Sequence, residues 1–154
     1  MKDKVLKGFV TRAIRENMSR RYFNSSSEKV LYNFNKNSEK IILCEGIFKA
    51  LRLERYLKIR SCAMLGHDLT ELQVEQLLSG KVRCVIVWPD LDKVGVQGAE
   101  RTVGRLMRES RLTVMIAPVL KKPADEATPE ALRDGLKRAQ AANYSTVNKL
   151  FNLV

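Results

Sequence analysis

Short apolar runs alternate with helical patterns from residue 39 onward, and this rhythm sets the predicted fold. Four runs are typical of buried strands, because nearly all their residues are apolar or β-branched. They cover residues 41–45, 61–65, 82–88 and 112–119. Strands that alternate with helices predict right-handed crossovers. We therefore expect an α/β fold, with a mostly parallel sheet of about four strands flanked by helices.

Helical periodicity predicts an element after each of these strands. The first helix has apolar positions between residues 47 and 57, and the third has them between 96 and 107. Thr70 begins the second helix with Gln73 three residues later, a capping box, and Gly80 ends it. Thr128 and Pro129 begin the fourth, which is expected to continue to about residue 142.

Residues 1–38 do not share this rhythm. Polar tracts at 24–27 and 33–38 are typical of loops between short, hairpin-like pieces. We therefore predict three parts: a small N-terminal appendage over residues 1–38, the α/β domain over 39–142, and a tail over 143–154 with room for a short helix.

Acidic residues follow two of the predicted strands. Glu45 and Gly46 end the first, and Asp90 and Asp92 follow the third. Ligands collect outside the carboxyl ends of parallel strands, so these acids are expected to share one crevice. Two carboxylates about 5 Å apart repel by roughly 3 kcal/mol at an effective dielectric near 20, which a divalent cation would relieve. Hard oxygen ligands favour Mg²⁺ or Mn²⁺ over zinc.

The charge of the chain indicates what kind of partner it binds. The chain has 154 residues, is 45% hydrophobic and carries a net charge of +11. Residues 1–40 hold ten Lys or Arg against four acids. A basic segment with interleaved aromatic residues suits a single-stranded nucleic acid, although it also suits an ordinary soluble surface. No apolar stretch reaches the roughly 20 residues that span a bilayer, and no signal-peptide core is present. A soluble, intracellular protein without a membrane partner is expected.

Cysteine, histidine and tryptophan provide little further chemistry. The cysteines, Cys44, Cys62 and Cys84, are widely spaced among apolar neighbours, so we interpret them as reduced core residues. His67 has no second histidine with which to share a metal and is interpreted as a loop residue. Trp88 is expected in the core rather than as a stacking platform for a base.

The order and spacing of the motifs indicate a family. Glu45-Gly46 after a strand, then a Leu65-Gly66 turn, then Asp90-x-Asp92 with Gly95, resembles the Toprim domain over residues 39–135. Within that superfamily the chain most resembles DnaG-type primases of bacteria and phages. Three segments support this, because they resemble the stretch that precedes Toprim in primases and that topoisomerases and Toprim nucleases lack: Gly8–Arg12, Arg21–Ser25 and Lys29–Tyr32.

The resemblance implies metal-dependent nucleotidyl transfer that makes RNA primers on single-stranded DNA. Glu45, Asp90 and Asp92 would be catalytic and would hold Mg²⁺ or Mn²⁺ together with Asp125. The residues implied in binding nucleotides or nucleic acid are Arg12, Arg21, Tyr22, Lys29, Lys121 and Lys122. The implied partners are a single-stranded DNA template and NTPs, with a replicative helicase or other primase subunits as candidates. The implied location is the cytoplasm of a bacterial or phage-infected cell.

Two departures from the primase pattern concern the acids. Lys49 stands where primases often have the acid of Glu-Gly-x-x-Asp. Where they have Lys-Asp-Pro-Asp, this chain has Lys122-Pro123-Ala124-Asp125, so one of the two acids is missing. A second cation should therefore bind more weakly. The chain also lacks the zinc module, most of the amino-terminal half of the polymerase core and the helicase-interacting region, so we expect a core fragment or one part of a split, phage-like primase.

Three alternatives remain open from the sequence. The chain could be a non-catalytic module of a replication complex that binds single strands. It could be a Toprim nuclease in which Glu45 acts as general base. Asp90 and Asp92 could also be ordinary turn residues without a metal, because aspartate is common in turns.

Overall fold

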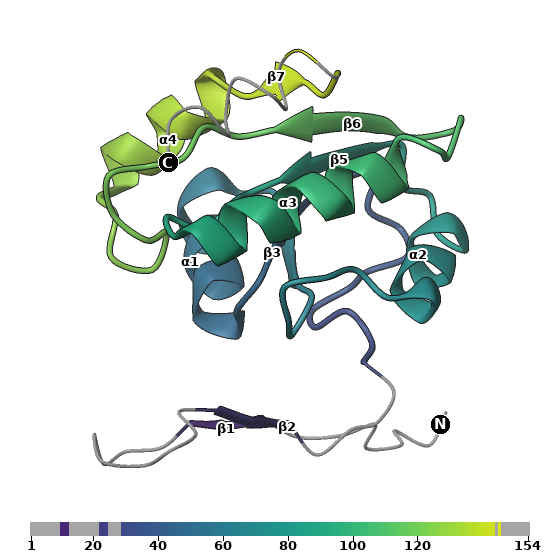
Figure 1. Cartoon of the computed structure of the whole chain (residues 1–154), viewed down its shortest axis with the longest axis horizontal. Coiled ribbons are helices and arrows are strands. Elements are labelled where there is room, and N and C mark those ends of the chain that lie inside the picture. Colours follow the sequence, from purple (N-terminus) through teal and green to yellow (C-terminus); the bar gives the residue numbers. More distant parts are fainter. Residues whose placement is uncertain (1–9, 13–21, 25–28, 144, 146–154) are drawn as a thin grey trace.

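A five-stranded sheet forms the centre of the computed structural model, which describes residues 10–12, 22–24, 29–143 and 145. The strand order is β4-β3-β5-β6-β7, with β3, β4, β5 and β6 parallel and β7 antiparallel (Figure 1). The strands are β3 (Lys40–Cys44), β4 (Arg60–Ala63), β5 (Cys84–Val87), β6 (Thr113–Ile116) and β7 (Gln140–Ala141). The predicted mostly parallel α/β sheet is confirmed.

Alternation along the central strand β3 supplies the two halves of the core. Ile41 and Leu43 pack on one face with residues of α2 (Glu71–Leu78) and α3 (Lys93–Leu106). Ile42 and Cys44 pack on the other face with residues of α1 (Ile47–Leu57) and α4 (Pro129–Lys137). All four side chains are fully buried. Burying each large apolar side chain contributes about 1.5–3 kcal/mol, so β3 anchors both layers.

Helix ends follow the capping residues. The predicted capping box of α2 is present, with Gln73 N donating to Thr70 Oγ1 at 3.3 Å and Thr70 N donating to Gln73 Oε1 at 3.0 Å. Thr128 Oγ1 accepts from Ala131 N at 3.2 Å at the start of α4. None of the helices in the described ranges combines the length and apolar character needed to cross a bilayer.

Two helix boundaries differ from the prediction. Helix α3 begins at Lys93, three residues before the first apolar position expected for it at residue 96, because Asp92 caps it. Helix α4 ends at Lys137 instead of about residue 142, and residues 140–141 form β7. Strand β7 pairs antiparallel with β6, so the sheet has five strands rather than about four. Pairing the open edge of β6 outweighs the helical tendency of this segment.

The N-terminal region contains a small second sheet. Strands β1 (Val10–Arg12) and β2 (Tyr22–Asn24) pair antiparallel with each other, in line with the predicted hairpin-like pieces. Nearer the α/β domain, Leu31 is buried and Tyr32 bridges Ala63 of β4. The domain boundaries at residues 38 and 142 stay predictions, and nearly all of the predicted tail lies outside the described residues.

Candidate metal and nucleotide site

The point where the chain reverses its direction of travel across the sheet creates the candidate site. From β3 the chain passes to β4 on one side and then to β5 on the other. Such a switch point opens a crevice at the carboxyl ends of the two central strands. Glu45 directly follows β3, and Asp90 follows β5. Asp125 lies in the loop after β6, the next strand across (Figure 1).

Glu45 and Asp90 lie close enough to interact through their side chains. Burial raises the pKa of Glu45 from its ordinary value of 4.5 to about 7, with help from the contact with Asp90 and the charges of Asp90 and Asp92. The nearby Lys49 charge opposes this rise only in part. On its other side, Glu45 Oε1 lies 2.7 Å from His67 Nδ1. Glu45 therefore changes its protonation state near neutral pH.

Lys49, on the first turn of α1, provides the positive charge in the crevice. Its Nζ donates to Asp90 Oδ2, and the side chains of Lys49 and Asp90 are only 19% and 12% exposed. Burial alone would lower the pKa of Lys49, but the bond to Asp90 and the charges of Asp90, Glu45 and Asp125 outweigh it and raise that pKa. The ammonium therefore stays charged while it faces three carboxylates.

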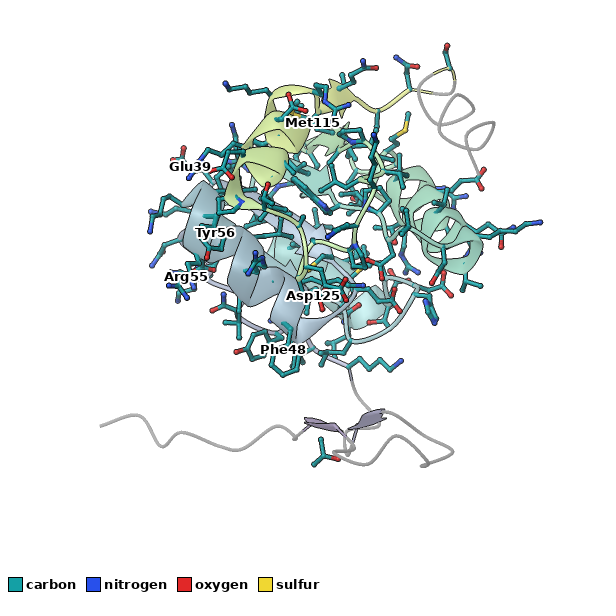
Figure 2. The ribbon with its side chains drawn as sticks, turned by 90° about the vertical axis from the view of Figure 1, so that its left-hand side faces the viewer. Glu39, Phe48, Arg55, Tyr56, Met115 and Asp125 are labelled. Carbon is teal, nitrogen blue, oxygen red and sulfur yellow. The ribbon has the colours of Figure 1, made fainter. Side chains whose placement is uncertain are left out.

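Asp92 and Asp125 take different positions. Asp92 is exposed, and its Oδ1 accepts a hydrogen bond of 2.7 Å from Gly95 N at the start of α3. Asp125 is half-buried, and its Oδ1 is buried without a hydrogen-bond partner among the described residues. In Figure 2 Asp125 lies beside α1, in agreement with its electrostatic effect on Lys49. An unsatisfied buried carboxylate oxygen is costly unless a donor or cation reaches it.

Close backbone approaches fix the loops around these acids. A Cβ at Gly95 would lie 2.4 Å from Asp90 Cβ, and one at Gly98 would lie 2.4 Å from His67 O. Only glycine allows α3 to approach both loops so closely. Leu65, two residues before His67, has φ 61 in the left-handed region, which a non-glycine residue rarely adopts. The loop that presents His67 to Glu45 therefore includes a backbone conformation that is unfavourable for leucine.

The donor set fits a hard divalent cation in its chemistry. Glu45, Asp90 and Asp125 offer carboxylate oxygens, which Mg²⁺ and Mn²⁺ prefer, and Asp125 has an oxygen in need of a partner. Among the described residues, however, no three Asp, Glu, His or Cys side chains already form a group that could hold a metal ion. In this arrangement Asp90 accepts from Lys49, and Asp92 accepts from Gly95 N. The assignment of Glu45, Asp90, Asp92 and Asp125 as ligands stays a prediction.

The basic residues implied in nucleic-acid binding are scattered. Lys29 Nζ lies against Gly66, where an added Cβ would be 2.9 Å away, and thus borders the His67 loop. Lys121 and Lys122 are exposed and line a surface hollow of about 420 Å³ with residues of the α4 region. Arg12 and Tyr22 are paired across β1 and β2. Their side chains, and all of Arg21, lie outside the described residues.

Sequence reasoning missed the contact between His67 and Glu45. The signal was available, because His67 follows the turn after the predicted strand 61–65, whose end lies beside the end of β3. Other expectations hold: Trp88 is 3% exposed, and Cys44, Cys62 and Cys84 are free, the first two buried and the third half-buried. Burial raises the pKa of Cys62 to about 12, so this thiol is unreactive.

Comparison with solved structures places the fold. No protein-family model and no curated protein matches the sequence. The E. coli primase catalytic core superimposes with a TM-score of 0.73 and 20% identity over 96% of this chain and 52% of that chain. The fold is that of the part of this core that the chain covers, a mostly parallel Toprim-type α/β sheet. A Pseudomonas aeruginosa DNA primase domain matches with a TM-score of 0.72 and 19% identity, over 87% of this chain and 47% of that one.

A third similar structure is a DnaG primase catalytic domain bound to single-stranded DNA. It matches with a TM-score of 0.70 and 20% identity, over 96% of this chain and 52% of that one. This chain therefore spans about half the length of the primase cores it matches. The predicted likeness to DnaG-type primases is confirmed at the level of the fold, and the activity of this primase-type Toprim fold is a separate question.

Proposed function

We propose that this chain supplies the cation-binding half of a primase-type nucleotidyltransferase that makes RNA primers on single-stranded DNA. The observation that carries the proposal is the meeting of Glu45 and Asp90 at the switch point of the sheet. The similarity to primase cores supports it, and one of those cores is described as bound to single-stranded DNA.

Each polar residue of the crevice has a proposed task. Glu45, Asp90, Asp92 and Asp125 would hold Mg²⁺ or Mn²⁺. A cation bound there would neutralise triphosphate charge and lower the pKa of the attacking hydroxyl. Glu45 holds a proton below about pH 7 and is ionised above it, so it becomes a ligand as the pH rises. His67 would keep Glu45 oriented through the contact at Oε1.

Basic residues outside the crevice would bind the phosphates. Lys29, beside the His67 loop, and the exposed pair Lys121 and Lys122 can each make a charge-assisted contact with a phosphate oxygen. Arg12, Arg21 and Tyr22 are proposed to contact the template or the incoming nucleotide. NTPs and a single-stranded template are therefore the proposed substrates, and a helicase or further primase subunits would complete the assembly.

The decisive experiment is primer synthesis on single-stranded DNA with NTPs and Mg²⁺ or Mn²⁺. The chain should be assayed alone and with added replication proteins, because it spans only half of the cores it matches. Asp90→Asn should abolish product. Glu75→Gln, which removes one negative charge from an exposed position on α2, should leave product formation unchanged. No product under any condition, from a chain that still binds the cation, would refute the proposal.

A non-catalytic module that binds single strands is the second candidate. The bond between Lys49 and Asp90 favours it, because the ammonium neutralises one carboxylate of the crevice. It predicts binding to single-stranded DNA whose affinity falls steeply with salt and survives both Asp90→Asn and Asp92→Asn. Primer synthesis that disappears in these variants while binding persists would exclude this candidate. Mg²⁺-dependent nicking of plasmid DNA would instead indicate a nuclease.

A further inference from the structure

The Lys49 side chain reaches across the crevice from the start of α1, which follows β3, to Asp90, which follows β5. Lys49 lies on the first turn of α1, directly after β3, while its partner Asp90 follows β5. Nζ donates to Asp90 Oδ2, and both side chains are largely shielded from solvent, at 19% and 12% exposure. Shielding makes the pair stronger than a surface ion pair, and it makes loss of either partner costly.

The Lys49 ammonium interacts electrostatically with the carboxylates on both sides of the crevice. Glu45 and Asp125 act on Lys49 in addition to Asp90. One positive charge therefore interacts with acids that follow β3, β5 and β6. A divalent cation that bound these acids would occupy the same region, because its best ligands are the oxygens that now face the ammonium.

We infer that Lys49 is a built-in counter-ion of this crevice, which holds the acids together without metal and competes with a divalent cation for Asp90. The inference depends on the proposed cation site but not on primer synthesis. It names a residue that sets affinity: a cation can bind fully only when the ammonium leaves Asp90. Even at the dielectric constant of water, a positive charge about 4–5 Å from a divalent ion weakens its binding by roughly 15- to 35-fold.

Manganese titration by calorimetry on the full chain tests this inference. Lys49→Met keeps the length of the apolar stem and removes the ammonium. The variant should bind Mn²⁺ at least about tenfold more tightly than the wild type, and its melting temperature without metal should be lower. Added Mn²⁺ should raise the melting temperature of the variant more than that of the wild type.

Lys93→Met is the matched control. Lys93 is exposed, immediately follows Asp92 and makes no ion pair with any described residue. Its loss removes the same charge from the neighbourhood without freeing Asp90, so Mn²⁺ affinity should change by less than about threefold.

Several results would overturn the inference. A folded Lys49→Met chain that binds Mn²⁺ no more tightly than the wild type would refute the inference. The proposed function would still stand if the wild type binds the ion and makes primers. An equal gain in Lys93→Met would reduce the effect to overall charge. If Lys49→Met does not fold without metal, Mn²⁺ should restore folding, and failure to restore it in both this variant and Lys49→Gln would also refute the inference.

Discussion

Glu45 and Glu54 lie near opposite ends of α1, and their surroundings differ sharply. Glu54 Oε2 accepts from Asn33 Nδ2 at 2.6 Å and from Ser61 N at 3.1 Å, and Oε1 pairs with Arg60 at 3.0 Å. Every partner is a donor, so the carboxylate is fully compensated. This arrangement ties the segment around Asn33 to β4 and needs nothing from outside the protein.

Glu45 has both acids and bases around it. Its neighbours include Asp90 and Asp92, and the pKa of Glu45 rises to about 7. His67 and Lys49 provide only partial relief. Burial is the largest cause of the raised pKa of Glu45, and its acidic neighbours add to it, whereas the partners of Glu54 are all donors. A buried carboxylate beside other acids is thus available for a ligand, and one surrounded by donors stabilises the fold. Four predictions follow from this contrast between a compensated and an uncompensated carboxylate.

The largest expected effect is a loss of cation affinity on substitution in the Glu45 crevice but not at Glu54. Asp90→Asn should weaken Mn²⁺ binding by about 100-fold, because it removes a charged ligand from the crevice. Glu54→Gln should leave that affinity within about twofold, since Glu54 lies in the separate Asn33 network. Calorimetric titration measures both. Equal losses in the two variants would show that the contrast has no functional meaning.

The free energy of unfolding should depend more on Glu54 than on Glu45. Glu54→Ala should lower the free energy of unfolding by about 2–3 kcal/mol, because Ser61 N and Asn33 Nδ2 lose their acceptor and Arg60 loses its partner. Urea unfolding without metal measures this change. Glu45→Ala should cost less, and a larger loss in Glu45→Ala than in Glu54→Ala would contradict the comparison.

The third prediction uses two glycines of the same helix. Gly95→Ala should cost about 1–3 kcal/mol of stability and weaken Mn²⁺ binding, because the new methyl group collides with Asp90. Gly104→Ala, which meets nothing within 4 Å, should instead stabilise the chain by about 0.5–1 kcal/mol through its better helix propensity. Thermal unfolding distinguishes them, and similar shifts of the same sign would refute the close packing of α3 on Asp90.

The smallest effect is the pH dependence of the metal-free chain. Glu45 binds its proton more tightly when folded, with a pKa of about 7 against an ordinary 4.5. Its contribution to stability is therefore full below about pH 4.5 and is lost as the pH rises through about 7. Between pH 5 and 8 the free energy of unfolding of the wild type should fall by on the order of 1–2 kcal/mol relative to that of Glu45→Gln. Parallel pH profiles would show that Glu45 ionises normally.

Strand positions and the order of the acids could be predicted from the sequence because they depend on local pattern. The runs around residues 42 and 86 are apolar on both faces, which only buried central strands require. Strand β7 could not be predicted, because the two residues Gln140 and Ala141 carry no strand pattern and form a strand only by pairing with β6. Tertiary pairing here overrides a helical sequence.

In the candidate site, too, some contacts could be predicted from the sequence and others could not. Topology alone brings Glu45 and Asp90 together, so the two strand-end motifs were sufficient. The bond from Lys49 to Asp90 depends on the direction of a long side chain across two strands, which spacing cannot give. The neighbouring strand ends place the His67 loop beside Glu45, but no local pattern indicates the left-handed conformation of Leu65 in that loop, which is unusual for leucine.

Short pairings cover part of each side of the four parallel strands of the central sheet. Strand β7 covers β6, with Ala142 N donating to Val114 O at 2.9 Å. On the opposite edge, Tyr32 exchanges two backbone hydrogen bonds with Ala63 of β4, at 3.0 and 3.3 Å. Exposed edges are the usual template for sheet extension between molecules. These short pairings leave less of the parallel sheet open to an added strand, so we expect a protein partner to bind this sheet chiefly through side chains and loops.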